Sequence, residues 1–234
     1  MMSERPVRLV LFDIDGTILR SNGAGRRAML AALREVFGAA GPEDHRYDGK
    51  TDPQIVREVM RLEGHHDAHI DERMDALMSL YLVQLEQELE HSRTLVHPGI
   101  FELLDALEER HDTILGLLTG NLREGAYAKL RAAGIDPDRF LVGAFGSDHE
   151  HRPELPALAR QRAHVELGVD LEGEHLVVIG DTPADIECGR SLGVRAIGVA
   201  TGAYSVDELR RHSPHAVFET LADTDRVVSA IVDA

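Results

Sequence analysis

A short, mostly apolar segment near the start of the chain ends in an acidic turn. Residues 7–12 (Val-Arg-Leu-Val-Leu-Phe) have the composition of a buried β-strand, and Asp13-Ile14-Asp15-Gly16-Thr17 follows directly. Two carboxylates one residue apart at a strand end repel each other, and a divalent cation removes that repulsion. Because hard oxygen ligands suit Mg²⁺, the turn predicts a Mg²⁺ site that includes Asp13 and Asp15.

Strand-like and helix-like segments alternate along most of the remaining chain. Further strands are expected at residues 113–119, 140–145, 175–179, 195–200 and 216–218. Helices are expected between and after them, at residues 100–110, 123–133, 154–167, 184–192, 206–211 and 222–232. This alternation predicts an α/β fold, a doubly wound parallel sheet with a Rossmann-like core, whose working loops lie at the carboxyl ends of the strands.

Residues 21–94 interrupt the alternation. Helical patterns occupy 26–37, 52–62 and 68–90, and Thr51 before Asp52-Pro53 has the composition of a helix start. We therefore expect a core formed by residues 1–20 and 95–234, with a small all-helical cap domain at 21–94 inserted after the first strand.

The acidic turn has the residues needed for phosphoryl transfer. Asp13 could bind the metal ion with one oxygen and attack phosphorus with the other. Asp15 could protonate the leaving oxygen and then activate water. Gly16 and Thr17 could offer backbone N–H groups to the phosphoryl oxygens.

Two later strand ends and one loop supply further candidates. Thr119-Gly120-Asn121 could hold a phosphate oxygen, although this composition is also common in turns. Asp181 is the expected third carboxylate of the metal site, and Asp185 lies in the first turn of a helix, where it also suits the helix dipole. Arg152 is expected as the fixed cation of the site, with a solvated loop arginine as the alternative reading and Arg160 as the runner-up.

Composition excludes several classes of partner. The chain of 234 residues has a net charge of −16, which disfavours nucleic acid and anionic membrane surfaces. No apolar segment is long enough to span a bilayer, and residues 1–6 do not resemble a signal peptide. Cys188 is the only cysteine, so no intrachain disulfide can form and we expect a cytoplasmic protein. Its oligomeric state is expected to be a monomer or a homodimer.

Together these motifs resemble the four ordered motifs of the haloacid dehalogenase superfamily, and most closely its phosphoglycolate phosphatase-like members with a helical cap. The resemblance implies that Asp13 is the phospho-accepting nucleophile and that Asp15 binds Mg²⁺ through its backbone carbonyl. It also implies that Thr119 and the Asn121 backbone bind phosphate, and that Asp181 completes the ligand set with support from Asp185. Arg152 stands where the family usually has lysine, and the two cations are not interchangeable.

The expected reaction is hydrolysis of a small phosphorylated metabolite, such as 2-phosphoglycolate, through an aspartyl-phosphate. Residues 47–52 are expected to form a cap loop over the site, in which Lys50 and Thr51 contact the substrate; an exposed lysine at a helix start is the alternative. A mutase like β-phosphoglucomutase and a non-catalytic phosphate-binding protein remain rival functions. Dehalogenation is disfavoured because dehalogenases lack an acid at the position of Asp15.

Overall fold

Strand β1 (Arg8–Phe12) lies at the centre of a parallel sheet and is buried over its whole length. In the computed structural model, which describes residues 6–233, β4 pairs with one edge of β1 and β6 with the other. The predictions for residues 1–5 and for Ala234 fall outside this range. The six strands run in the order β5-β4-β1-β6-β7-β8, which is 3-2-1-4-5-6 when they are numbered among themselves. This order confirms the predicted doubly wound α/β class.

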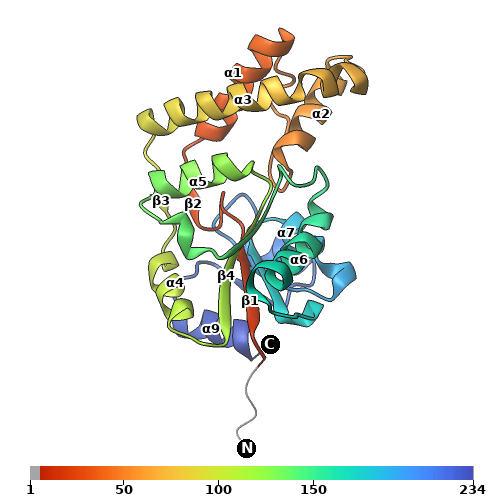
Figure 1. Cartoon of the computed structure of the whole chain (residues 1–234). Coiled ribbons are helices and arrows are strands. Elements are labelled where there is room, and N and C mark those ends of the chain that lie inside the picture. The colour runs from red at the N-terminus through yellow and green to blue at the C-terminus, as the bar shows by residue number, and fades with distance from the viewer. Residues whose placement is uncertain (1–5, 234) are drawn as a thin grey trace, which may run out of the picture.

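The strands and helices of the core agree closely with the segments expected from sequence (Figure 1). The other sheet strands are β4 (Thr113–Thr119), β5 (Val142–Phe145), β6 (Leu176–Gly180), β7 (Arg195–Val199) and β8 (Ala216–Phe218). The core helices are α4 (Ile100–Glu108), α5 (Arg123–Ala132), α6 (Leu155–Leu167), α7 (Pro183–Cys188), α8 (Val206–Arg210) and α9 (Thr224–Val232). Short 3₁₀ turns occupy η1 (Pro137–Arg139), η2 (Arg152–Glu154), η3 (Gly173–His175) and η4 (Arg190–Leu192).

Two elements have different bounds from those expected: one strand begins later, and one helix ends earlier. The strand expected from residue 140 begins at Val142, because η1 still holds Phe140 through a bond from its N–H to the Pro137 carbonyl. The helix expected over 184–192 stops at Cys188, because Val194 packs so closely on Gly189 that a Cβ there would lie 2.4 Å from the Val194 Cβ. That expectation of one continuous helix was wrong.

Alternate residues of β1 build two separate hydrophobic layers. Val10 and Phe12 point to the face covered by α4, α5 and α9, whereas Leu9 and Leu11 point to the face covered by α6. Both layers are closed to solvent, which explains why β1 lacks the polar alternation of a half-exposed strand. No helix within residues 6–233 is long and apolar enough to cross a membrane.

Three helices form the cap above the carboxyl end of the sheet: α1 (Ala24–Phe37), α2 (Asp52–Leu62) and α3 (Asp67–His91) (Figure 1). They enclose their own hydrophobic cluster, in which Leu33, Met60 and Leu77 are fully buried. The chain enters the cap through β2 (Leu19–Arg20) and returns through β3 (Leu95–Val96), which pair in antiparallel fashion. β2 ends at residue 20 and β3 begins at residue 95, at the two boundaries given for the inserted segment in the sequence analysis.

Two glycines show two different ways in which an added side chain would destabilise the fold, through backbone strain and through steric overlap. They are Gly99, just before α4, and Gly38, just after α1. Both have positive φ, but a Cβ on Gly99 would lie 2.3 Å from the Leu221 carbonyl oxygen, whereas a Cβ on Gly38 would meet nothing within 4 Å. Gly38→Ala should lower the free energy of unfolding by about 1–2 kcal/mol through backbone strain alone. Gly99→Ala should lower it by about 2–5 kcal/mol, because overpacking is added. Urea denaturation would measure both, and equal losses would contradict the collision.

Candidate active site

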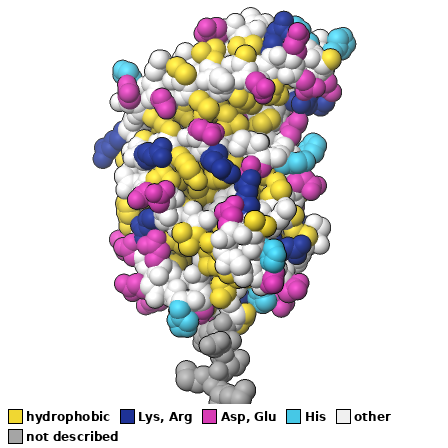
Figure 2. All heavy atoms as spheres, viewed as in Figure 1, with side chains coloured by type: hydrophobic (Ala, Val, Ile, Leu, Met, Phe, Trp, Pro, Cys, Tyr) yellow, Lys and Arg dark blue, Asp and Glu magenta, His cyan; other side chains and the backbone are white. Residues whose placement is uncertain are grey.

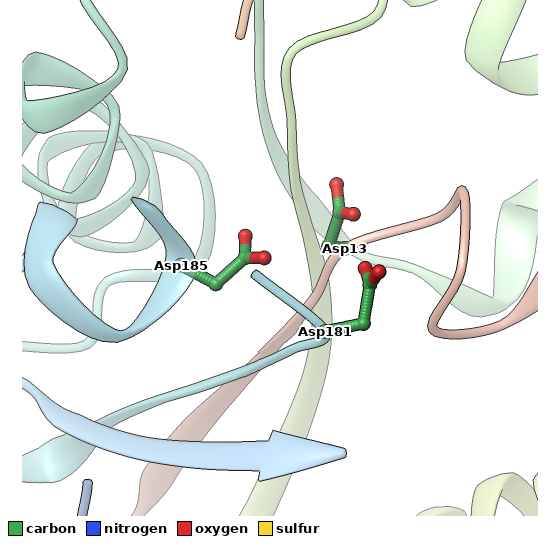
Figure 3. A group of neighbouring side chains, drawn as sticks. All are labelled: Asp13, Asp181 and Asp185. Atoms are coloured by element: carbon green, nitrogen blue, oxygen red, sulfur yellow. The ribbon is translucent and has the colours of Figure 1, made fainter. Parts of the chain in front are cut away.

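Three carboxylates meet where β1 and β6 end. Asp13 follows β1, Asp181 follows β6, and Asp185 lies in the first turn of α7. One ligand oxygen from each lies within 4.8 Å of the others, and the exposed fractions of the three residues are only 5%, 5% and 1% (Figure 3). The cluster forms because β1 and β6 are neighbouring parallel strands, whose carboxyl ends share one edge of the sheet.

The carboxylate cluster has the electrostatics of a cation site. Burial, together with the negative charges of Asp185 and Asp15, raises the pKa of Asp13 to about 7 against the opposing charge of Arg152. Burial, together with the charges of Asp185 and Asp13, likewise raises the pKa of Asp181 to about 9 against the same opposing charge. A divalent cation would favour the ionised form of both groups, and carboxylate oxygens are the ligands that Mg²⁺ prefers. The residues present therefore fit a hard divalent cation.

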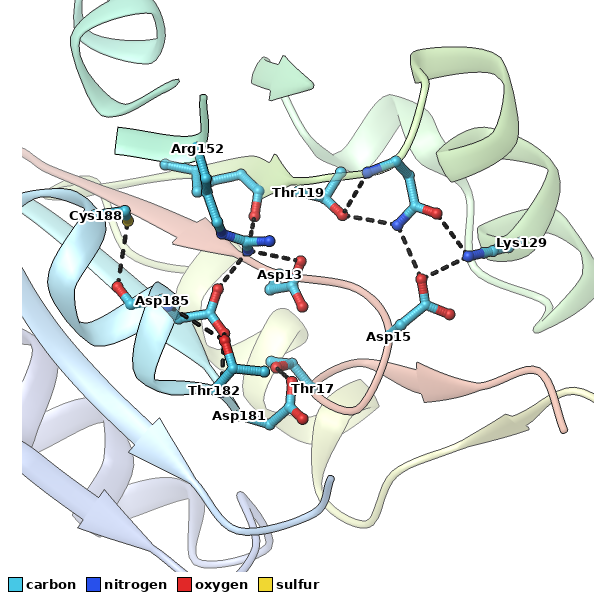
Figure 4. Close-up of polar contacts among 12 residues, drawn as sticks. Asp13, Asp15, Thr17, Thr119, Lys129, Arg152, Asp181, Thr182, Asp185 and Cys188 are labelled. Carbon is cyan, nitrogen blue, oxygen red and sulfur yellow. Dashed lines mark hydrogen bonds and ion pairs between the residues drawn. The ribbon is translucent and has the colours of Figure 1, made fainter. Parts of the chain in front are cut away.

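Arg152 is the buried cation of this cluster. Its Nη2 lies 3.0 Å from Asp13 Oδ1, forms an ion pair with Asp185 Oδ1, and donates a hydrogen bond of 3.3 Å to the Leu118 carbonyl (Figure 4). The 3₁₀ turn η2 directs the side chain into the site. Asp185 also accepts hydrogen bonds from the N–H and hydroxyl of Thr182, at 2.9 and 2.7 Å, so it both caps α7 and holds Arg152.

Asp15 faces a second cation, which the sequence reasoning missed. Its Oδ2 accepts hydrogen bonds from Asn121 Nδ2 at 2.9 Å and from Lys129 Nζ at 2.5 Å, and Lys129 Nζ also donates to Asn121 Oδ1 at 2.6 Å (Figure 4). The available signal was helical spacing: Ala126, Lys129 and Leu130 share the buried face of α5. The Asp15 side chain therefore points away from the three clustered carboxylates, and only its backbone carbonyl remains as the expected metal ligand.

Gly16 and Thr17 make contacts within the turn and with Asp181. Their N–H groups donate to the Leu19 carbonyl at 2.9 Å and the Ile14 carbonyl at 3.3 Å, respectively. The phosphate contacts expected of these N–H groups stay a prediction, whereas the support that both residues give to Asp181 was not expected from sequence. The Thr17 hydroxyl donates to Asp181 Oδ1 at 3.3 Å, and Gly16, at φ +85°, leaves the room that Asp181 fills, since a Cβ there would lie 2.4 Å from Oδ2.

The segment 119–121 closes the site on the β4 side. Thr119 Oγ1 accepts hydrogen bonds from Asn121 Nδ2 at 2.8 Å and from the Asn121 N–H at 3.4 Å. The Thr119 hydroxyl keeps its own hydrogen to donate, which suits a phosphate oxygen. Gly120 lies against the cap, because a Cβ at this position would be 2.0 Å from the Lys50 carbonyl oxygen.

The loop before α2 is docked on the core. Asp52 makes two of the contacts: its N–H donates to the Gly120 carbonyl at 2.8 Å, and its Oδ2 accepts from the Leu122 N–H at 2.8 Å. Thr51 Oγ1 donates to the Glu150 carbonyl at 2.7 Å, and Arg57 Nε donates to both carboxylate oxygens of Glu150 at 2.8 and 2.9 Å. The cap is thus joined to the core by backbone and by charge.

Lys50 and Thr51 have different surroundings. Lys50 lines the cavity, but its Nζ forms an ion pair with Glu58 and lies 3.2 Å from His45 Nε2. Thr51 is fully buried, and its hydroxyl also caps α2 by accepting from the Gln54 N–H. Thr51 therefore helps to hold the loop, and the substrate contact expected of it from sequence stays a prediction.

A cavity of about 250 Å³ lies between cap and core. Its core side includes Asp13, Asp15, Thr119, Lys129 and Arg152, and its cap side includes Arg26, Met29, Tyr47, Lys50 and Tyr81. Figure 2 shows acidic side chains scattered over cap and core, with several basic side chains along the level where the two meet. The cavity is small, and it combines acidic and basic side chains with apolar and aromatic walls.

Comparison with known proteins agrees with this geometry. Residues 10–190 match the family model of haloacid dehalogenase-like hydrolases. The chain belongs to this family. It is 29% identical to a probable phosphatase, IndB, of Dickeya dadantii, over 96% of this chain and 94% of that protein. It is 27% identical to phosphoglycolate phosphatase 1 of Pseudomonas aeruginosa, over 92% of this chain and 78% of that protein.

The fold is also similar to that of solved structures. A hydrolase from Pseudomonas syringae superposes with a TM-score of 0.73 at 21% identity, over 96% of this chain and 99% of that one. The likeness covers both cap and core.

Asp52 makes the stability of the closed cap depend on pH. Burial raises the pKa of Asp52 to about 6 against the opposing charge of Lys129, so the folded protein holds this proton more tightly than the unfolded chain does. The ionised form therefore costs stability above about pH 6, and this cost disappears below about pH 4. Asp52→Asn mimics the neutral form, and Asn can still accept from the Leu122 N–H.

We expect Asp52→Asn to raise the free energy of unfolding at pH 8 by about 2–3 kcal/mol and to leave it unchanged at pH 4. Denaturant unfolding at the two pH values would measure this. Asp48→Asn, in the same loop but with a partly exposed side chain 3.2 Å from Arg46, is the matched control and should change stability little at either pH. A loss of stability at pH 8 in Asp52→Asn would contradict the assignment.

Proposed function

We propose that this protein is a Mg²⁺-dependent phosphatase that hydrolyses a small phosphomonoester through an aspartyl-phosphate on Asp13. The observation that carries the proposal is the meeting of Asp13, Asp181 and Asp185 beside one buried arginine, at the floor of a cavity that also holds Asp15. The relatives named as phosphatases support the same chemistry.

In the first step, Asp13 attacks phosphorus and the bond from phosphorus to the leaving oxygen breaks. Asp15 gives that oxygen a proton, so the product leaves as a neutral alcohol. In the second step, Asp15 takes a proton from water as the water oxygen attacks phosphorus, and Asp13 is released with inorganic phosphate.

Other residues hold the reacting groups in place. Arg152 sits against Asp13 and is suited to balance charge on the transferring phosphoryl group. Thr119 and the backbone of 120–121 are proposed to hold a phosphoryl oxygen. A bound Mg²⁺, held by Asp13, Asp181 and the Asp15 carbonyl with Asp185 in support, would neutralise phosphoryl charge and align donor with acceptor.

A substrate resembling 2-phosphoglycolate suits the cavity, and a cytoplasmic location suits such a metabolite. The volume of about 250 Å³ favours a small ester, and the cations on its cap side favour a second anionic group. Lys50 remains a candidate for that group, although it would share its charge between the substrate and Glu58. A screen of phosphorylated metabolites with Mg²⁺ present would rank the esters, and isomerised sugar phosphate in place of free phosphate would favour a mutase.

The nucleophile can be tested directly. Asp13→Asn should lower kcat for p-nitrophenyl phosphate by roughly 10³-fold or more, because Asn is a poor nucleophile and cannot form the acyl phosphate. Chelation of Mg²⁺ should abolish wild-type turnover, and acid-quenched wild type should carry one phosphoryl group on the peptide that contains Asp13. Activity of Asp13→Asn within about tenfold of wild type would rule out the aspartyl-phosphate.

A further inference from the structure

Lys129 is a buried cation that the nucleophile does not need. Only 4% of its surface is exposed, and burying an ammonium group is costly unless it is paired. Arg152 already forms an ion pair with Asp13. Lys129 lies on the opposite side of the site, where it pairs with Asp15 (Figure 4) and donates a hydrogen bond to Asn121. On the core side of the cavity, two buried cations are thus each paired with a different aspartate of the first turn.

The contacts on Asp15 are one-sided. Lys129 Nζ and Asn121 Nδ2 both donate to Oδ2, at 2.5 and 2.9 Å. Within residues 6–233, Oδ1 of Asp15 has no hydrogen-bond or ion-pair partner. The Asp15 side chain is 42% exposed and lines the cavity. Oδ1 is therefore the carboxylate oxygen left for a partner in the cavity, whereas Oδ2 is held by its two donors.

This asymmetry decides which oxygen can carry a proton. A protonated carboxyl group has one hydroxyl oxygen and one carbonyl oxygen, and the carbonyl oxygen accepts hydrogen bonds. Two N–H donors point at Oδ2, so a proton on Oδ2 would face them directly. The proton of Asp15 therefore belongs on Oδ1.

We propose that Lys129 is a positioning residue that, together with Asn121, holds Asp15 Oδ2 so that Oδ1 delivers the proton to the leaving oxygen. The inference rests on the proposed role of Asp15 as general acid and base. As the bond from phosphorus to the leaving oxygen breaks, the proton on Oδ1 moves to that oxygen. In the second step Oδ1 takes a proton from water, and Lys129 keeps all of its own protons throughout.

The cap touches the same lysine. Gly25, on α1, lines the cavity, and a Cβ there would lie 3.2 Å from Lys129 Nζ and 3.7 Å from the Tyr81 hydroxyl oxygen. The first turn of α1 thus lies over the ammonium group without a side chain between them. This contact offers a second way to disturb Lys129 without removing it.

The test compares leaving groups that differ in their need for a proton. Lys129→Met should slow alcohol release from an alkyl phosphate by about 10²-fold or more in a single turnover, because general acid catalysis is lost. Release of p-nitrophenolate, which leaves without a proton, should fall less than about fivefold, since little of the general-acid contribution applies to it. Arg131→Met, on the same helix with an exposed side chain, is the matched control and should change neither rate.

A merely structural role predicts equal losses for the two esters, and that result would overturn the proposal. Gly25→Ala keeps the test decisive if Lys129→Met does not fold, because alanine favours a helix and its methyl group displaces Nζ by only a few tenths of an ångström. It should slow alkyl ester cleavage about 3- to 10-fold more than p-nitrophenyl ester cleavage, a small part of the general-acid contribution. No difference would again overturn the proposal.

The two levels of inference fail in different ways. A wild-type protein that forms no aspartyl-phosphate would overturn the proposed function, and the role of Lys129 with it. A wild type that is phosphorylated on Asp13, combined with a Lys129→Met variant that loses both activities equally, would overturn the role of Lys129 alone.

Discussion

The repulsion among Asp13, Asp181 and Asp185 is the constraint on which the rest of the site depends. Two neighbouring parallel strands place these carboxylates together in a dry pocket, where each charge is costly. Arg152 offsets part of that cost by pairing with two of them, and the raised pKa values of Asp13 and Asp181 indicate that one guanidinium is not enough. The site is built to receive further positive charge.

Several residues of the surrounding turns and loops hold the carboxylates and the cap loop in place. The N–H groups of Gly16 and Thr17 donate hydrogen bonds within the turn. The Thr17 hydroxyl donates to Asp181, and the missing side chain of Gly16 leaves room for the Asp181 carboxylate. Because Gly120 has no side chain, the backbone of the cap loop at Lys50 can pack directly against it. Because Asp52 then anchors the loop on the Leu122 N–H, the wall that faces a substrate is held just after β4, the neighbour of the strand that carries Asp13.

Much of the fold was predictable because its signals are local. The apolar segments before Asp13, Thr119 and Asp181 are short, buried on both faces and followed by turn residues, so their strands appeared where expected. Element ends were less predictable where packing decides them. A helix was expected to continue to residue 192, but α7 ends at Cys188, where Val194 packs on Gly189. The strand at residues 216–218, by contrast, was predicted and pairs with β7.

The sequence by itself determined the order of the four motifs, the class of the sheet and the identity of the clustered carboxylates, since each of these follows from residues adjacent in the chain. Tertiary structure alone decided that Lys129 meets Asp15 across 114 positions of sequence, that Thr51 joins the cap to the core, and that Lys50 shares its charge with Glu58. The physical reason is that a side chain's partner depends on how helices and loops pack. Local propensity and spacing carry no record of that packing.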